Sequence, residues 1–401
     1  WLTGRLYPTV SITWLRALPG RRFQGEGNEG RRNRRHRVRR GRTELPNPRT
    51  DRRGRGRGRA GPEKLPLHAD RRPTGTAPGH RGQDVARLRL RSRPKPVIVT
   101  NGGKQAVYES FQILLNEGDE VIIPTPYWTS YPEAVKLAGG VPVTVFAGAD
   151  RNFEPSIEDI EAARTEHTKA IIVNTPNNPT GAVWKPETVK AIAQWAIEHH
   201  VWVISDEIYE HLNYDGAKTT YIGAAVPEVR SQLLVLNGVA KTYAMPGWRV
   251  GWMIAPVDVA KAASKLQGHM TSNVNNISQR AAIEAVSGSP DAVYEMCAAF
   301  DKRRQTIVAA LNDIEGVNCP TPTGAFYAFA DVTALLNKPL GTNKTTFAKT
   351  SELAAALLDE GHVAAVPGEA FGAPGYLRFS YALADDDLVE GMRRMKRWVE
   401  D

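Results

Sequence analysis

From Val97 onward, short apolar runs alternate with longer stretches whose apolar residues recur every three or four positions. The apolar runs predict seven β-strands, at residues 97–100, 120–123, 141–145, 169–173, 201–205, 233–236 and 250–254. The amphipathic stretches predict helices at residues 104–115, from about 131, at 156–164 and at 186–200. Apolar strands that alternate with helices are typical of a mostly parallel sheet covered by helices on both faces. We therefore expect an α/β fold built on a seven-stranded sheet.

The pattern changes after a predicted helix at about residues 277–287. A long helical stretch at residues 290–312 comes next. Predicted strands follow near 325–330, 363–366 and 377–380, with predicted helices at about 346–361 and 385–399. These elements predict a smaller α+β domain. The chain is thus expected to consist of a leader, residues 1–95, a large domain, residues 97–288, and a small domain, residues 289–401.

Residues 1–95 show little of this periodicity and differ in composition. They contain 25 Arg and 2 Lys against 7 acidic residues, a net charge of +20, whereas the rest of the chain carries −11. On composition this segment is expected to be disordered. It could be an arginine-glycine arm that binds nucleic acid, a transit peptide, or an out-of-frame translation of a GC-rich gene. Its length and acidic residues argue against a transit peptide, and the abrupt change near Val97 favours the frame error.

Two positions in the rest of the chain suggest a chemistry. Lys241 lies among small and apolar residues, an environment in which lysine amines act as nucleophiles. Asp206 ends an apolar strand, so its carboxylate is expected at the edge where open α/β sheets bind ligands, whereas its neighbour Glu207 points the other way. A lysine that forms a Schiff base and an aspartate beside a pyridinium nitrogen are the two anchors of pyridoxal 5'-phosphate (PLP). Each residue alone also has an ordinary structural explanation.

Three further features place a group that could bind a ligand at the start of a predicted helix, after a predicted strand, or inside one. Gly102 and Gly103 open a predicted helix, where free backbone N–H groups form a natural phosphate site, although two glycines also form ordinary tight turns. Trp128 follows a predicted strand, as core aromatic residues often do. Arg378 lies within an apolar strand, where an unpaired guanidinium is costly and a structural ion pair is the plain explanation.

Six motifs occur together and in one order along the chain. They are Gly102-Gly-Lys-Gln105, Pro126-Tyr-Trp128, Asn174-Thr-Pro-Asn-Asn178-Pro-Thr-Gly181, Ser205-Asp-Glu-Ile-Tyr209, the segment from Lys241 through Gly247-Trp-Arg249-Val-Gly251, and Leu377-Arg-Phe-Ser-Tyr381. This set resembles the class I/II aminotransferases of the fold-type I PLP enzymes, and most closely the bacterial aspartate aminotransferases. The resemblance runs from about Val97 to the C-terminus and does not include residues 1–95.

The resemblance implies PLP as the cofactor and assigns roles to the residues of the motifs. Lys241 would hold the coenzyme and move the substrate proton, Asp206 would keep the pyridine nitrogen protonated, and Tyr209 would complete the catalytic set. The other implied coenzyme-binding residues are Gly103 and Arg249 at the phosphate, Trp128 on the ring face, and Lys104 and Asn178. Substrate would be held by Arg378 at its α-carboxylate, by Asn178, and by Lys104 at a distal carboxylate. A solvated first-turn lysine is the alternative for Lys104.

The resemblance implies the fold of the fold-type I PLP enzymes and a homodimer with shared active sites. The function that it implies is transamination of aspartate with 2-oxoglutarate. An aromatic or prephenate aminotransferase and a C–S lyase use the same coenzyme residues and stay open as alternatives. From a different class, a basic nucleic-acid-binding protein with a retained enzyme domain also stays open. No metal is expected. Two cysteines and the lack of an apolar run of about 18 residues predict a cytoplasmic protein without a transmembrane helix.

Residues 1–95 depart from the family. Family members carry in this region a helix that closes over the site, a Gly-x-Pro-Asp-Phe stretch, and a Tyr that reaches the partner subunit's coenzyme phosphate. Residues 1–95 contain no Gly-x-Pro-Asp-Phe, and the segment 73–78 contains no tyrosine. We therefore expect the chain to bind coenzyme but to turn over poorly, and a one-base shift upstream of about Val97 to restore these motifs.

Overall fold

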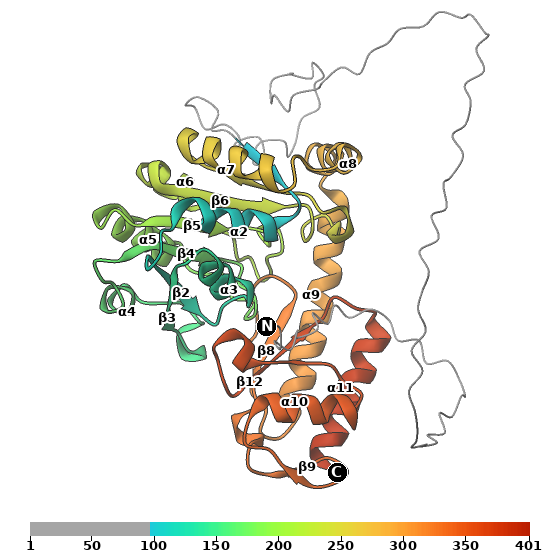
Figure 1. Cartoon of the computed structure of the whole chain (residues 1–401). Coiled ribbons are helices and arrows are strands. Elements are labelled where there is room, and N and C mark those ends of the chain that lie inside the picture. The colour runs from blue at the N-terminus through green and yellow to red at the C-terminus, as the bar shows by residue number, and fades with distance from the viewer. Residues whose placement is uncertain (1–96) are drawn as a thin grey trace, which may run out of the picture. The chain divides into compact units, whose positions relative to one another are not determined.

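The computed structural model describes residues 97–401, so the predictions made for residues 1–95 lie outside the described residues. Seven strands of the described part form one sheet (Figure 1). They are β1 (Val97–Thr100), β2 (Glu120–Thr125), β3 (Val141–Phe146), β4 (Thr168–Asn174), β5 (Trp202–Asp206), β6 (Leu233–Gly238) and β7 (Gly251–Ile254). Their order is β1-β7-β6-β5-β4-β2-β3, and only β7 runs antiparallel to its neighbours. The predicted mostly parallel seven-stranded sheet is confirmed.

Two sets of helices cover the two faces of this sheet. One face packs against α2 (Gly103–Leu114), α3 (Ser130–Leu137) and α7 (Val257–Met270). The other face packs against α4 (Ile157–Ala162), α5 (Pro186–Glu198) and α6 (Ile222–Ala225). Successive residues of β4 serve opposite faces, since Ala170 and Ile172 belong to the first core and Ile171 and Val173 to the second. Both faces being buried explains why the central strands are apolar throughout.

Helix α7 was missed by the sequence pattern. It contacts the sheet through Val259, Ala260 and Ala263, while most of its other side chains are polar or small. Alanines give only a weak hydrophobic signal, so the apolar stripe of this helix is faint in the sequence. Helix α8 (Asn276–Ser287) follows, and α9 (Asp291–Asn312) then leads from the sheet to the C-terminal elements (Figure 1).

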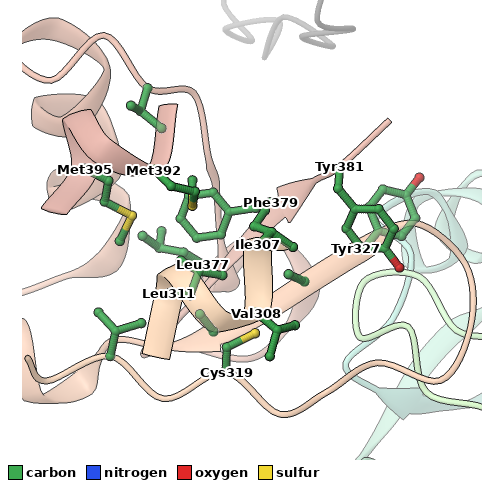
Figure 2. Packing of buried hydrophobic residues seen from close by; sticks show 14 of the residues in the cluster. Ile307, Val308, Leu311, Cys319, Tyr327, Leu377, Phe379, Tyr381, Met392 and Met395 are labelled. Atoms are coloured by element: carbon green, nitrogen blue, oxygen red, sulfur yellow. The ribbon is translucent and has the colours of Figure 1, made fainter. Parts of the chain in front are cut away.

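The C-terminal part contains a three-stranded antiparallel sheet in the order β11 (Val366–Pro367), β12 (Tyr376–Ser380), β8 (Tyr327–Asp331). Helices α10 (Thr350–Asp359) and α11 (Asp385–Glu400) pack with it, and β9 (Pro339–Leu340) and β10 (Thr345–Thr346) form a short hairpin. The core between these elements includes Ile307, Leu311, Leu377 and Met395 (Figure 2). This small mixed domain agrees with the predicted α+β architecture, whereas the boundary at residue 289 stays a prediction.

Two local predictions in this domain were wrong. The strand expected at residues 363–366 is reduced to Val366–Pro367, because Val363 donates its backbone N–H to Leu357 and closes the end of α10 instead of pairing in the sheet. The hairpin of β9 and β10 was not predicted, and α10 begins at Thr350 rather than near residue 346. Two-residue strands are too short to give an alternating pattern.

The carboxyl ends of the parallel strands meet at one edge of the large sheet. The segment that precedes β8 docks at the same edge by backbone hydrogen bonds. Gly324 N donates to Gly181 O (2.7 Å) and Ala325 N to Leu212 O (2.9 Å). The first strand of the small domain therefore begins beside the loops that follow β4 and β5.

Candidate active site

Asp206 is the last residue of β5, and its carboxylate is buried at the carboxyl edge of the sheet. Oδ2 accepts a hydrogen bond from the Tyr131 hydroxyl (2.8 Å), and Oδ1 accepts one from the Ile208 N–H (3.2 Å). Burial raises the pKa of Asp206 to about 6, and the two hydrogen bonds and the charge of Lys241 act in the opposite direction. Asp206 is thus a buried carboxyl whose ionised form a nearby cation stabilises.

Lys241 lies in the loop between β6 and β7. The loop is closed by backbone bonds from Val239 N to Val250 O (3.1 Å) and from Met245 N to Val239 O (3.3 Å). The Lys241 Nζ lies 5.9 Å from the ring centroid of Tyr209 and 5.4 Å from that of Phe326. The lysine therefore faces two aromatic rings and the Asp206 carboxylate.

The start of α2 is crowded by backbone and by a guanidinium. Gly102 has φ +81°, and a Cβ at this position would overlap the Arg249 guanidinium. A Cβ at Gly251 would come within 2.6 Å of the backbone of Gly102 and Gly103. Glycine is required at position 102 by its positive φ, and at position 251 because β7 and the helix start approach so closely.

The same region concentrates positive charge. Arg249 donates to the backbone carbonyls of Pro246 (2.8 Å) and Asn101 (3.3 Å), and no side chain caps the N-terminus of α2. Burial and the charge of Arg249 lower the pKa of Lys104. Two cations beside free backbone N–H groups form a setting that favours an anion.

Lys104 connects this anion-binding end to Asp206 through aromatic rings. Its Nζ donates to Ser130 Oγ (2.9 Å) and lies 4.9 Å from the ring centroid of Trp128. Trp128 in turn meets Tyr131 edge to face, with ring centroids 5.3 Å apart. The Tyr131 hydroxyl then binds Asp206, so one chain of contacts crosses the site.

On the other side of Asp206, Asn178 joins the large sheet to the small domain. The Arg378 Nη1 of β12 donates to Asn178 Oδ1 (2.8 Å), and Asn178 Nδ2 donates to the Tyr209 hydroxyl (3.5 Å). The backbone N–H of Asn178 is held by Asn174 Oδ1 (3.1 Å), and Asn174 Nδ2 donates to Asp206 O (3.0 Å). The Asn178 amide is therefore oriented by both domains.

The structure thus brings the nine predicted site residues together. Some of them contact one another or interact through their charges, and others are connected through Tyr131, Ile208 or Gly102. These nine are Gly103, Lys104, Trp128, Asn178, Asp206, Tyr209, Lys241, Arg249 and Arg378. Their individual roles stay predictions.

Sequence reasoning missed Tyr131, Phe326 and Tyr327. The Tyr327 hydroxyl lies 2.9 Å from the Tyr209 hydroxyl, and burial together with Tyr327 raises the pKa of Tyr209. Two signals could have pointed to these residues. Tyr131 follows Trp128 by three positions at the start of a helix, and Phe326 and Tyr327 follow the segment Pro322-Thr-Gly-Ala325.

Comparisons with known proteins identify the family. The sequence model of aminotransferase class I and II matches residues 82–394, a match that begins ahead of Val97, where the resemblance was expected to begin. An aspartate aminotransferase of Streptomyces avermitilis is 56% identical over 305 residues, 76% of this chain and 74% of the relative. An aspartate/prephenate aminotransferase of Cereibacter sphaeroides is 42% identical over 309 residues, 77% of each chain.

Solved structures agree with this assignment. The aspartate aminotransferase of Thermus thermophilus with maleate matches at a TM-score of 0.72 and 37% identity, and covers 79% of this chain and 80% of that one. The chain belongs to the class I and II aminotransferase family. The predicted family and fold are confirmed. Within residues 97–401, no helix is both long and apolar enough to cross a bilayer.

Proposed function

We propose that this chain is a PLP-dependent aminotransferase that transfers the amino group of aspartate to 2-oxoglutarate. The observation that carries the proposal is the buried Asp206 carboxylate, whose ionised form is favoured by the charge of Lys241. A buried carboxylate and a lysine that serve one site supply the two anchors of PLP. The name aspartate aminotransferase of the Streptomyces relative supports the choice of substrate.

The residues present fit PLP. Its phosphate would bind the start of α2, where Gly102 leaves room for the Arg249 guanidinium. Its ring nitrogen would pair with Asp206, whose buried position without a full ion pair calls for a cation. Trp128 would cover the ring face, and Asn178 and Tyr209 would donate to the phenolic oxygen.

The chain's own residues would then perform the proton transfers. When bound, PLP supplies a conjugated ring that accepts the electron pair left on the substrate α-carbon after deprotonation. Asp206 would hold a proton on the ring nitrogen. Lys241 would first hold the coenzyme and, once released by the substrate amine, would carry the proton from the α-carbon to the coenzyme C4′.

Two cations would select a dicarboxylate substrate. Arg378 presents a planar fork suited to the α-carboxylate. Lys104, whose Nζ lies 4.9 Å from the ring centroid of Trp128, would bind the distal carboxylate. Maleate, the ligand named for the Thermus structure, is itself a dicarboxylate and supports this pairing.

Borohydride reduction tests the coenzyme assignment directly. The purified protein should gain a visible absorption band with PLP, and reduction followed by peptide mass spectrometry should find the pyridoxyl group on Lys241. Lys241→Ala should lose both the band and the label. A label on another lysine, or no band with added PLP, would overturn the assignment.

A second substrate class remains because the Cereibacter relative carries the name aspartate/prephenate aminotransferase. Oxo-acid production should be compared with aspartate, prephenate, phenylalanine and cystathionine as substrates. A preference for aspartate supports the proposal, whereas faster turnover of prephenate or cleavage of cystathionine would replace it.

We also propose a homodimer in the cytoplasm. Helix α8 buries only Ala282 in the described chain, and its Ile277 and Val286 are exposed, which supports a second copy as the cover for this face. The two cysteines, Cys297 and Cys319, are free, which supports a reducing compartment.

A further inference from the structure

The guanidinium of Arg378 lies between two aromatic rings. Its Cζ is 4.5 Å from the ring centroid of Tyr327 and 4.8 Å from that of Phe371. Both rings are buried, with 6% and 1% of their surface exposed. Within the described residues, the Arg378 Nε is buried without a hydrogen-bond partner, while its Nη1 donates to Asn178 Oδ1 (2.8 Å). The cation is thus held by ring faces and one amide.

Arg378 is half-buried, with a buried Nε, and within residues 97–401 it lacks the acidic partner that a buried arginine usually has. A buried guanidinium normally pairs with a carboxylate, as Arg304 does with Asp215 and Asp301 in this chain. An acidic partner at Arg378 would neutralise the charge and compete with an incoming carboxylate. Ring faces attract a cation through their quadrupole and take none of its N–H groups. The fork therefore stays charged and open toward an anionic ligand.

The two rings are themselves fixed from different elements. Tyr327 begins β8 and meets the Tyr209 hydroxyl at 2.9 Å. Figure 2 shows Tyr327 at the edge of the small-domain core, with its hydroxyl directed away from the aliphatic side chains. Phe371 meets Phe329 edge to face at 5.9 Å, and its carbonyl accepts from Tyr127 N (3.2 Å). The Tyr209 hydroxyl thus restrains the Tyr327 ring, and Phe329 restrains the Phe371 ring.

We propose that Tyr327 and Phe371 form an aromatic clamp that positions Arg378 for the substrate carboxylate. They are positioning residues, because they act on the substrate through Arg378. The inference rests on the proposed function, in which Arg378 binds the α-carboxylate. It assigns the effect to the ring of Tyr327 and not to its hydroxyl.

Calorimetric titration of the PLP-loaded protein with succinate, a dicarboxylate that cannot react, measures the effect. Tyr327→Leu and Phe371→Leu should each weaken succinate binding about tenfold, the size expected for a desolvated cation–ring contact. Tyr327→Phe keeps the ring and should stay within about twofold of the parent. Phe347→Leu serves as a matched control, because it removes a ring of similar burial that stacks on Trp398 instead.

A second readout separates positioning from general damage. The single-turnover rate with ethylamine, which has no carboxylate, should be equal in Phe371→Leu and in the parent, because Phe371 packs on Phe329 and Arg378 and, unlike Tyr327, is not bonded to Tyr209. The clamp is overturned if Tyr327→Leu binds succinate like the parent or if the ethylamine rate falls. It is also overturned if Tyr327→Phe or Phe347→Leu loses as much succinate affinity as Tyr327→Leu. Arg378→Leu tests the proposed function separately. If that variant binds succinate like the parent, the carboxylate role of Arg378 fails, whatever the rings do.

Discussion

Asp206 ionises in a place where its charge is poorly solvated. Its pKa rises from 3.8 to about 6 in the folded protein because of burial. Between these values the folded state keeps a proton that the unfolded state has released. The contribution of Asp206 to the free energy of unfolding therefore falls as the pH rises from about 4 to about 6 and is constant above that. A shift of roughly two units corresponds to about 3 kcal/mol.

Replacing this carboxyl by an amide, which does not titrate, should remove the loss of stability that Asp206 causes as the pH rises. We compare the free energy of unfolding of Asp206→Asn with that of the parent, both stripped of PLP. The difference should shift in favour of Asp206→Asn by about 3 kcal/mol as the pH rises from 4 to 7.5. Urea unfolding at several pH values measures the difference. Parallel stability curves for the two proteins would show that burial does not raise the pKa of Asp206 as described above.

A substitution of Lys104 tests whether the site binds the distal carboxylate of the substrate. Lys104→Met keeps the chain length but removes the charge, so kcat/KM for aspartate should fall roughly 10- to 100-fold, the value of a charged hydrogen bond. The value for alanine, which has no distal carboxylate, should stay within a few-fold. Lys136→Met is the control, because Lys136 is exposed and pairs with Glu133 on α3. An equal loss for both substrates would assign Lys104 to the coenzyme alone.

Single residues show where sequence reasoning reached the site and where it stopped. Asp206 and Arg378 were predictable because a polar side chain at the end of, or inside, an apolar strand stands out in the local pattern. Tyr131 was not, since its partner Asp206 is 75 positions away. The two hydroxyls of Tyr209 and Tyr327 are separated by 118 positions. Such pairs exist only after the chain has folded, and each aromatic residue alone looks like core.

At the scale of elements, the turn after β4 and the segment before β8 fit together through a glycine. Gly181 has φ +70°, and a Cβ there would lie 2.5 Å from Pro322 Cβ and 2.8 Å from Gly324 O. Gly181→Ala should lower the free energy of unfolding by about 2–4 kcal/mol, from backbone strain and from the clash. It should also weaken succinate binding, because the displaced segment leads directly to Tyr327.

Gly216 provides the control for this substitution. It has φ +74° but open space around the Cβ position, so Gly216→Ala measures the backbone strain alone. We expect a loss of about 1–2 kcal/mol without any change in succinate binding. Guanidinium unfolding of both variants checks the difference. Equal losses would mean that the small domain does not depend on the close approach at Gly181.

The strands and helices that bury many large apolar side chains were the ones that the sequence pattern predicted. The central strands are buried on both faces and appear as continuous apolar runs, and the less buried edge strands β1 and β3 are short runs rich in valine, so all seven were found. Helix α7 buries two alanines, a valine and a glutamine, so its apolar stripe is faint and the helix was missed, whereas β11 spans two residues and was predicted too long. The order of the strands was not predicted, because local periodicity does not show which strands pair.

At the scale of the whole molecule, exposed apolar side chains gather on successive helices. Ile277 and Val286 on α8 are 71% and 51% exposed, and Tyr294 on α9 is 59% exposed. Side chains of this size and exposure on one run of the chain favour a protein interface over open solvent. A second copy of the chain is the cover we propose, since the family resemblance implies active sites shared by two subunits.

A charge placed on this face should therefore separate the subunits. In Ile277→Asp, the carboxylate would be buried without a partner at the interface, so sedimentation should shift from the mass of two chains toward the mass of one. Val389→Asp on α11 is the matched control, because Val389 is 55% exposed but lies on the small domain, and it should leave the mass unchanged. If the parent sediments as a single chain, or if both variants dissociate alike, the α8 face is not the interface. If only Ile277→Asp dissociates and it also loses PLP affinity, the two sites depend on each other across the dimer.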